Sequence, residues 1–519
     1  MGERQTTLGA RQAGVCLHIS ALPGRYGIGE IGNEAYDFVD TLNRMGMGTW
    51  QFLPLGPTAF GNSPYQLLST FAGNEMLIDT ADLVHRGLLS QQEAGVLEVL
   101  PGNTVDYTAL IPLKSALLSL AAERFARRAS ARQKAALDAF LHDADMAWLH
   151  EYALFRVIKS KHGEVAWTEW LPEFKHHDDD ALKRLEADAA LAIERIKILQ
   201  FLFHDQWRRL RRYAQAAGVR LFGDMPICIA MDSADAWANP EILRIDRDGV
   251  PECIAGVPPD YFSEDGQLWG NPLYDWHAHR ANDFRWWVSR LESAVELADL
   301  VRIDHFRGLE ALWSIPADAQ TARSGHWETS PGRELFEAFR KRLGSLPIVA
   351  EDLGVITPAV EALRKDNGIP GMVVLQFEAT DPHFSLDTVT EDCVCYTGTH
   401  DNDTTLGWYL SGTEARISSA EARTKQATVL ALTGGSAETI ALDLTRCALQ
   451  TRAQLAIAPM QDLLSLGSEA RFNTPGTAGN NWQWRLSKSQ LSDATCDVIA
   501  EMVTLSGRHV HSQGIAAHS

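Results

Sequence analysis

The chain has 519 residues, of which 45% are hydrophobic and 22% charged, and its formal net charge is −20. This composition is typical of a globular protein with a large buried core. The negative charge repels the phosphate backbone of nucleic acids, so we expect no nucleic-acid partner. No run of about 18 apolar residues is present, so we also expect no membrane span.

Seven cysteines are spread along the sequence: Cys16, Cys228, Cys253, Cys393, Cys395, Cys447 and Cys496. An odd number without a Cys-x-x-Cys pair argues against a disulfide framework and against a zinc site. The N-terminal segment lacks the apolar region of a secretion signal. We therefore expect a cytoplasmic protein with reduced cysteines and no metal site.

Short apolar runs that end in polar residues are typical of the buried parallel strands of a barrel. The sequence has eight such runs, at residues 15–19, 49–53, 219–222, 300–303, 347–350, 373–377, 394–396 and 454–458. Segments with apolar residues at helical spacing lie between them, at 33–45, 196–217 and 358–365. Thr357 and Pro358 begin the last of these as cap and first helical residue. This alternation predicts an α/β fold, a (β/α)8 TIM barrel.

The predicted strands are unevenly spaced, which indicates insertions into one catalytic barrel domain of residues 1–519. Residues 55–215, between the second and third strands, have mainly helical patterns and predict a helical insertion subdomain. Residues 225–299 form a second insertion, between the third and fourth strands. Its segment 255–276 is too rich in turn residues for a regular element and too apolar for a linker, so we expect a long active-site loop.

Acidic residues follow several of the predicted strands, namely Asp224, Asp304, Glu351, Asp401 and Asp462. In a TIM barrel the C-terminal ends of the strands meet at one rim, where catalytic residues lie. Cleavage of a glycosidic bond needs one protonated carboxyl group and one ionised carboxylate. The acids at this rim therefore indicate a glycoside-cleaving barrel enzyme.

The neighbours of two acids favour opposite protonation states. Arg302 lies two residues before Asp304 on the same strand face, which favours the ionised carboxylate of a nucleophile. Glu351 has no adjacent cation in the sequence, which suits a raised pKa and the role of an acid. Asp352 should point the other way, because strand neighbours alternate.

Each signal also has a structural interpretation. A single Asp at a strand end often caps the next helix, and His400–Asp401 could be a polar pair without a catalytic role. Several acids at one rim favour a barrel hydrolase nonetheless. The 15 tryptophans agree with a sugar substrate, because the C–H faces of sugars stack on aromatic rings. Tyr65, Trp269 and Trp408 lie in turn-rich segments and are candidates for such contacts.

The sequence resembles the bacterial amylomaltases, or 4-α-glucanotransferases, from Gly14 to about Arg485. The motifs that carry this resemblance are Ser63-Pro64-Tyr65-Gln66, Phe71-Ala72-Gly73-Asn74, Gly223-Asp224-Met225-Pro226-Ile227, Gly256-Val257-Pro258-Pro259-Asp260-Tyr261-Phe262, Gln267-Leu268-Trp269-Gly270-Asn271-Pro272, Arg302-Ile303-Asp304-His305-Phe306-Arg307-Gly308, Ala350-Glu351-Asp352-Leu353-Gly354, Thr399-His400-Asp401-Asn402 and Asn473-Thr474-Pro475-Gly476-Thr477. Family members often have Tyr where this chain has Phe60, a ring that can stack but has no hydroxyl to contact a remote glucan segment.

The resemblance implies a role for each matching residue. Asp304 is similar to the family's nucleophile, Glu351 to its acid/base and Asp401 to its transition-state stabiliser. The resemblance also implies a set of substrate-binding residues: Arg302, His400, Tyr65, Ser63, Asp224, Asp260, Gln267, Trp269, Asn271, Asn473 and Pro475. Maltooligosaccharides, glucose and α-1,4-glucans are the expected partners, and no cofactor is expected because each broken bond is replaced by a like bond.

The resulting hypothesis is a retaining transfer of α-1,4-glucan segments through a covalent glycosyl-enzyme. An α-amylase-type retaining hydrolase on the same barrel is the closest alternative. A second alternative is a metal-dependent barrel hydrolase, with His18, His305, His400 and Asp401 as metal ligands. A third is a non-catalytic glucan-binding protein, but binding alone would not require the intact acids.

Overall fold

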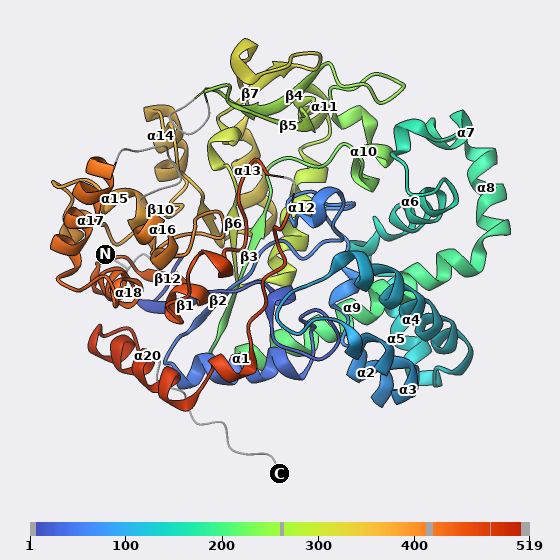
Figure 1. Ribbon diagram of the computed structural model, residues 1–519. Helices are drawn as coiled ribbons and strands as arrows, with labels where there is room; N and C mark the ends of the chain where they lie inside the picture. The colour runs from blue at the N-terminus through green and yellow to red at the C-terminus, as the bar shows by residue number, and fades with distance from the viewer. Residues whose placement is uncertain (1–6, 260–263, 412–418, 478, 510–519) are drawn as a thin grey trace.

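The computed structural model describes residues 7–259, 264–411, 419–477 and 479–509 (Figure 1). At its centre lies a sheet of eight parallel strands. In spatial order these are β10 (Gly371–Val374), β11 (Cys393–Tyr396), β12 (Leu455–Pro459), β1 (Gln12–Cys16), β2 (Thr49–Gln51), β3 (Arg220–Met225), β6 (Leu300–Ile303) and β9 (Ile348–Ala350).

The two ends of this sheet meet. The backbone N–H of Ala350, in β9, donates to the carbonyl of Pro370, directly before β10, at 2.8 Å. The sheet is thus a nearly closed barrel, and the predicted TIM-barrel fold is confirmed. All eight predicted runs correspond to barrel strands, although some are shifted; the run at 373–377, for example, ends inside α15 (Leu375–Glu378).

Helices surround the barrel. α1 (Asn33–Arg44) and α14 (Pro358–Asp366) begin where the sequence predicts, and the side chain of Thr357 accepts the backbone N–H of Val360 at 3.4 Å. The other helices outside the long segment between β2 and β3 are α10 (Ala234–Ala238), α11 (Trp276–Ala281), α12 (Arg285–Leu297), α13 (Gly332–Leu343), α16 (Thr405–Ser411), α17 (Ser419–Thr433), α18 (Ile440–Gln450), α19 (Met460–Leu463) and α20 (Asp493–Leu505). None of the helices in the described ranges is long and apolar enough to cross a membrane.

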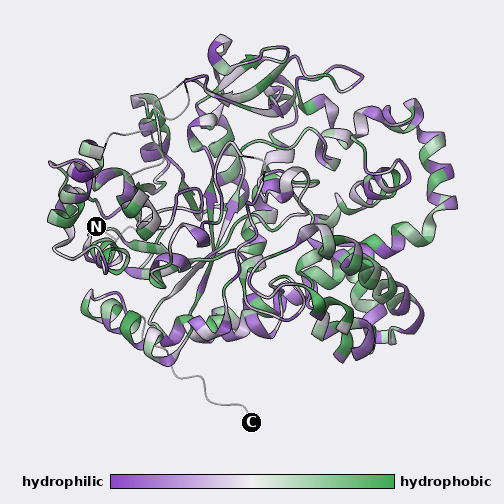
Figure 2. Ribbon diagram, viewed as in Figure 1, coloured by the Kyte–Doolittle hydropathy of each residue, from purple (hydrophilic) through white to green (hydrophobic). Residues whose placement is uncertain are grey.

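The segment between β2 and β3 is mainly helical and lies to one side of the barrel (Figure 1). It contains α2 (Thr80–His85), α3 (Gln91–Ala94), α4 (Tyr107–Arg128), α5 (Ala131–Leu141), α6 (Leu149–Lys161), α7 (Pro172–Lys175), α8 (Asp179–Asp188) and α9 (Ala190–Ala216). Figure 2 shows hydrophobic residues where α4, α5 and α9 meet. A buried ion pair between Lys114 and Glu30 ties α4 to the loop after β1. The exact bounds 55–215 and 225–299 stay a prediction.

A second, four-stranded antiparallel sheet covers one end of the barrel (Figure 1). Its order is β5 (Gln267–Pro272), β4 (Cys253–Val257), β7 (Ala311–Pro316) and β8 (His326–Thr329). The prediction that 255–276 contains no regular element is therefore wrong. Glycine and proline obscured the strand pattern, yet Gly256 is required there, because a Cβ atom would lie 2.1 Å from the Gln267 carbonyl oxygen.

Candidate active site

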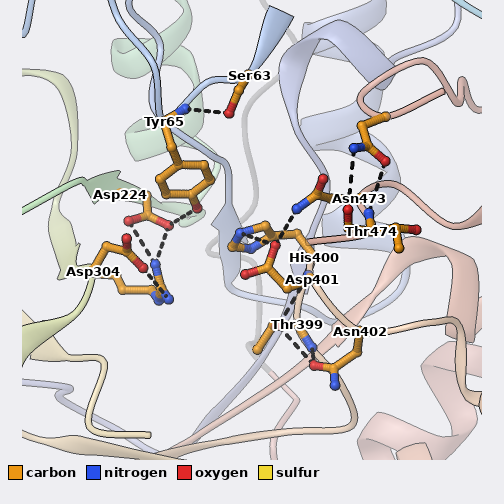
Figure 3. A network of polar contacts seen from close by, with 12 residues as sticks. Ser63, Tyr65, Asp224, Asp304, Thr399, His400, Asp401, Asn402, Asn473 and Thr474 are labelled. Atoms are coloured by element: carbon orange, nitrogen blue, oxygen red, sulfur yellow. Dashed lines mark hydrogen bonds and ion pairs between the residues drawn. The ribbon is translucent and has the colours of Figure 1, made fainter. Parts of the chain in front are cut away.

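A buried arginine connects two of the predicted acids at the C-terminal ends of β3 and β6 (Figure 3). Nη1 of Arg302 donates to both carboxylate oxygens of Asp224, at 3.0 and 2.8 Å, and Nη2 lies 2.9 Å from Oδ1 of Asp304. The Asp224 side chain is fully buried, whereas that of Asp304 is 30% exposed. Asp304 is thus held in place by a fixed cation while its side chain stays partly open to solvent.

Tyr65 joins this group to the seventh barrel strand. Its hydroxyl donates to Oδ2 of Asp224 at 2.8 Å, and its ring stacks on His400 with centroids 5.1 Å apart and planes 12° from parallel. Figure 3 shows Tyr65 between Asp224 and the His400–Asp401 pair. The hydroxyl of Ser63 in turn accepts the backbone N–H of Tyr65 at 3.2 Å, which fixes the loop that carries the ring.

Glu351 follows β9, and its carboxyl group is held by two backbone donors. The N–H of His305 lies 2.7 Å from Oε2, and that of Leu353 lies 3.1 Å from Oε1. Burial, assisted by the charge of Asp304, raises the pKa of Glu351 to about 7, although Arg302 and the two donors oppose the shift. Glu351 can therefore hold a proton near neutral pH, as its sequence surroundings predict.

Asp401 is more open than the other acids, with its side chain 46% exposed. Its Oδ1 accepts the side-chain amide of Asn473 at 2.6 Å and lies 3.4 Å from Nε2 of His400. Arg471 donates to the Asp401 carbonyl at 2.8 Å and to the Asn473 carbonyl at 2.7 Å. Sequence reasoning missed Arg471, because Asp401 lies 70 positions away on another loop.

The acids lie close enough to act on the same neighbouring side chains. Burial raises the pKa of Tyr65 well above its usual value, and the negative charges of Asp224, Asp304 and Asp401 add to that effect against Arg302. Burial lowers the pKa of Arg302, but carboxylates that include those of Asp224 and Asp304 raise it well above its usual value, so the guanidinium stays charged. Carboxylates from several strands thus act on the same two side chains.

Comparison with known proteins shows the family. A family model described as 4-alpha-glucanotransferase matches residues 17–491. The chain belongs to the 4-α-glucanotransferase family. A 4-alpha-glucanotransferase of Thermus thermophilus is 44% identical to it over 93% of this chain and 96% of that protein. One from Synechocystis is 41% identical over 97% of this chain and 99% of that protein.

A solved structure agrees with this assignment. The amylomaltase of Streptococcus agalactiae in complex with acarbose superposes with a TM-score of 0.91 and 37% identity, covering 96% of this chain and all of that one. The expected family, enzyme class and fold are therefore confirmed for this 4-α-glucanotransferase family member.

The remaining predicted substrate-binding residues are more scattered. Trp269 contacts His305 edge-to-face, with centroids 4.8 Å apart, and its indole N–H donates to Gln267 at 3.2 Å. Asn271 is buried, and its amide donates to the Ile229 carbonyl at 2.7 Å, so it fixes β5 to the segment after β3. Pro475 is exposed. Asp260 and the side chain of Phe60 lie outside the described part of the structure.

Two sequence predictions about this rim need correction. Asp462 does not line the open rim, because it is fully buried and accepts hydrogen bonds from Thr397, directly after β11, at 2.6 Å and from Thr405, at the start of α16, at 2.7 Å. Trp408 lies inside α16 and is buried in the core, so it offers no sugar platform. In contrast, Asp352 points away from Glu351 as predicted, accepting the N–H of Met372 at 2.7 Å.

The proposed metal ligands do not form a cluster. Across the described ranges, no group of three or more His, Cys, Asp or Glu side chains is placed to hold a metal ion. Burial lowers the pKa of His18 to about 3 and that of His305 to about 4, so both rings are neutral near pH 7.

Proposed function

We propose that the protein transfers α-1,4-glucan segments from a donor maltodextrin to the 4-OH of glucose or of another glucan, through a covalent glycosyl-enzyme. In the first step the carboxylate of Asp304 attacks C1 of the donor, and Glu351 gives its proton to the departing glycosidic oxygen. The observation that carries this proposal is the pairing of a buried Glu351, with a pKa of about 7, with an Asp304 held by Arg302.

The second step reverses the roles. The 4-OH of the acceptor attacks C1, Glu351 takes the hydroxyl proton, and the bond between C1 and Asp304 breaks. The configuration at C1 is inverted twice and is therefore retained. Because a like bond replaces each broken bond, the reaction needs neither an energy source nor a cofactor.

We propose that Asp401 is the transition-state stabiliser. Its carboxylate is half exposed, and Asn473 and His400 contact Oδ1. We infer that it accepts hydrogen bonds from hydroxyls of the sugar that reacts, contacts that strengthen as positive charge develops at C1. Tyr65 and Arg302 keep the opposite wall fixed, since both contact the buried Asp224.

Transfer has to compete with attack by water. β5 places Gln267 and Trp269 beside His305, the residue that follows Asp304. We propose that this part of the second sheet holds the acceptor and excludes water from the glycosyl-enzyme.

A related structure also supports the substrate class. The related amylomaltase structure was obtained in complex with acarbose. We propose maltooligosaccharides, glucose and α-1,4-glucans as substrates here. We further propose that the protein acts in the cytoplasm, a location supported by the free thiols of all its cysteines, since disulfides form in oxidising compartments.

Incubation with maltotriose tests the function. Glucose and longer maltodextrins should appear while the total number of reducing ends stays constant. A steady rise in reducing ends would instead identify the α-amylase-type hydrolase that is the main alternative. Asp304→Ala should abolish the reaction, and transfer by that variant would rule out Asp304 as the nucleophile.

A further inference from the structure

A groove of about 780 Å³ opens outside the catalytic cleft, between the hairpin at residues 244–252, the start of α11 and the end of β8. Its volume lies in the range of known ligand pockets, about 300–1,000 Å³. None of the residues labelled in Figure 3 lines it. The segment that runs from β5 into α11 nevertheless connects the groove with the catalytic cleft. Trp269, in β5, contacts His305 at the cleft, and Trp276, seven residues later, lines the groove.

The groove contains a fixed aromatic ring. Trp276 is half-buried, and its indole packs on Tyr274 with centroids 5.2 Å apart and on Trp287 at 6.0 Å with planes 23° apart. Tyr274 is itself anchored, since its hydroxyl donates to the Ile227 carbonyl at 2.8 Å. A ring held in this way loses little entropy when a ligand stacks on it. Its remaining surface offers an apolar platform to the groove.

Polar groups surround this platform in a fixed arrangement. Nη1 of Arg244 donates to both oxygens of Glu328, at 2.6 and 2.7 Å, and Nη2 donates to Glu252 at 2.9 Å. All three residues line the groove, as do Asp246 and Asp275. Acids thus outnumber the single arginine, which disfavours an anionic ligand. A neutral ligand with both hydroxyls and C–H faces fits carboxylates, a guanidinium and an indole together.

We propose that this groove is a second α-glucan-binding site, which holds a distant segment of a long glucan while another segment reacts at the catalytic cleft. The proposal rests on the proposed function for the identity of the ligand. Tethering a polymer at two places raises the local concentration of its chain ends at the cleft. A trisaccharide cannot be tethered at the groove while it reacts at the cleft. Loss of the groove should therefore change the kinetics with a long glucan and not those with a trisaccharide.

Two variants test the groove without touching the catalytic residues. Trp276→Leu removes the flat ring but keeps apolar bulk for its packing. Thr329→Arg places a long side chain in the groove from an exposed position at the end of β8. Thr424→Arg, at an exposed position on α17, is the matched control. Each protein is assayed with amylose and with maltotriose, and thermal melting checks its fold.

Both groove variants should raise KM for amylose about two- to tenfold, the loss expected for one aromatic contact, with maltotriose kinetics as in the unmodified protein. Thr424→Arg should change neither the KM for amylose nor the kinetics with maltotriose. Unchanged amylose kinetics in both folded groove variants would overturn the proposal. Equal losses with amylose and maltotriose would also overturn it, because the groove would then act on the catalytic centre.

A binding measurement separates this proposal from the proposed function. Electrophoresis in gels with and without amylopectin reads glucan binding without turnover. In the Asp304→Ala background, adding Trp276→Leu should reduce the retardation by amylopectin, and equal retardation would refute the groove site. If the unmodified protein leaves maltotriose unchanged, the proposed function fails, yet the gel still reports whether the groove binds glucan.

Discussion

The backbone N–H of His305 donates to Oε2 of Glu351 at 2.7 Å, so the residue that follows Asp304 holds the carboxyl group at the end of the neighbouring strand. His305 has a left-handed backbone, with φ of 48°, which turns the chain after β6. The N–H of Phe306 also donates to the Glu351 carbonyl at 3.0 Å. Asp304 and Glu351 are therefore placed relative to each other through the backbone, not through a flexible side-chain contact.

Glu351→Gln should lower kcat for maltotriose disproportionation by about 10²–10⁴, the usual contribution of a general acid–base group. The amide keeps the shape of the side chain but has no proton to give to the leaving oxygen. A maltosyl fluoride donor, whose leaving group needs little protonation, should recover much of the first step. Asp352→Asn is the control, because Asp352 faces away from the cleft. Full activity of Glu351→Gln would contradict its role.

The pH dependence should show the proton on Glu351. Because its pKa is raised to about 7, the fraction that is protonated falls as the pH rises through that value. The first step needs the protonated form, so kcat/KM should fall about tenfold per pH unit above roughly pH 7.5. Initial rates with maltotriose measure this limb. A kcat/KM that stays level from about pH 6 to 9 would exclude Glu351 as the proton donor of the free enzyme.

Arg302→Lys should reduce both activity and stability. A lysine ammonium is a point charge that cannot bridge Asp224 and Asp304 as the guanidinium does. The buried Asp224 would lose hydrogen bonds that it now accepts from Arg302. Breaking a buried ion pair lowers the free energy of unfolding by about 3–5 kcal/mol at most. Denaturant unfolding and maltotriose kinetics measure the two effects. The control Arg323→Lys changes an exposed arginine paired with Asp265 and should leave both unchanged.

Tyr65→Phe separates the hydroxyl of Tyr65 from its ring. The ring would still stack on His400, but the hydrogen bond to Asp224 would be lost. A hydrogen bond to a charged group contributes about 1.5–3 kcal/mol, so we expect kcat/KM to fall by roughly 10- to 150-fold. Tyr213→Phe removes a similar hydroxyl contact, to Asp40 on the surface, and should leave kcat/KM unchanged. Equal effects of the two substitutions would show that Tyr65 has no special part in the site.

The barrel was predictable because its strands are buried on both faces and read as apolar runs that end in polar residues. Asp304 and Glu351 were predictable for the same reason, since they follow those runs directly. The partner of Asp304 on its own strand, Arg302, was also visible. The link from Arg302 to Asp224 was not, because the two residues are 78 positions apart and only the barrel brings them together.

The second sheet was not predictable from local pattern. β4 pairs with β7, which lies about 60 residues further along the chain, so its stability depends on a distant partner. Asn271 and Asp462 show the same limit at single residues. Both carry polar groups expected at the substrate, and in both the hydrogen bonds are made to distant parts of the chain.

Asp462→Asn tests whether that buried acid positions the loop that carries His400 and Asp401. Its carboxylate accepts three hydrogen bonds from Thr397 and Thr405, at 2.6, 2.7 and 2.7 Å. If the amide nitrogen of the substituted side chain faces the backbone N–H of Thr405, it cannot accept that hydrogen bond. A buried donor left without a partner lowers the free energy of unfolding by about 1–3 kcal/mol. We expect lower stability and, because the loop shifts, a lower kcat and a higher KM for maltotriose. Asp443→Asn alters another buried acid, bound to Thr439 and Arg446 around α18, and should lower stability while kcat and KM stay the same. If Asp462→Asn also lost only stability, its carboxylate would serve the fold and not the placement of Asp401.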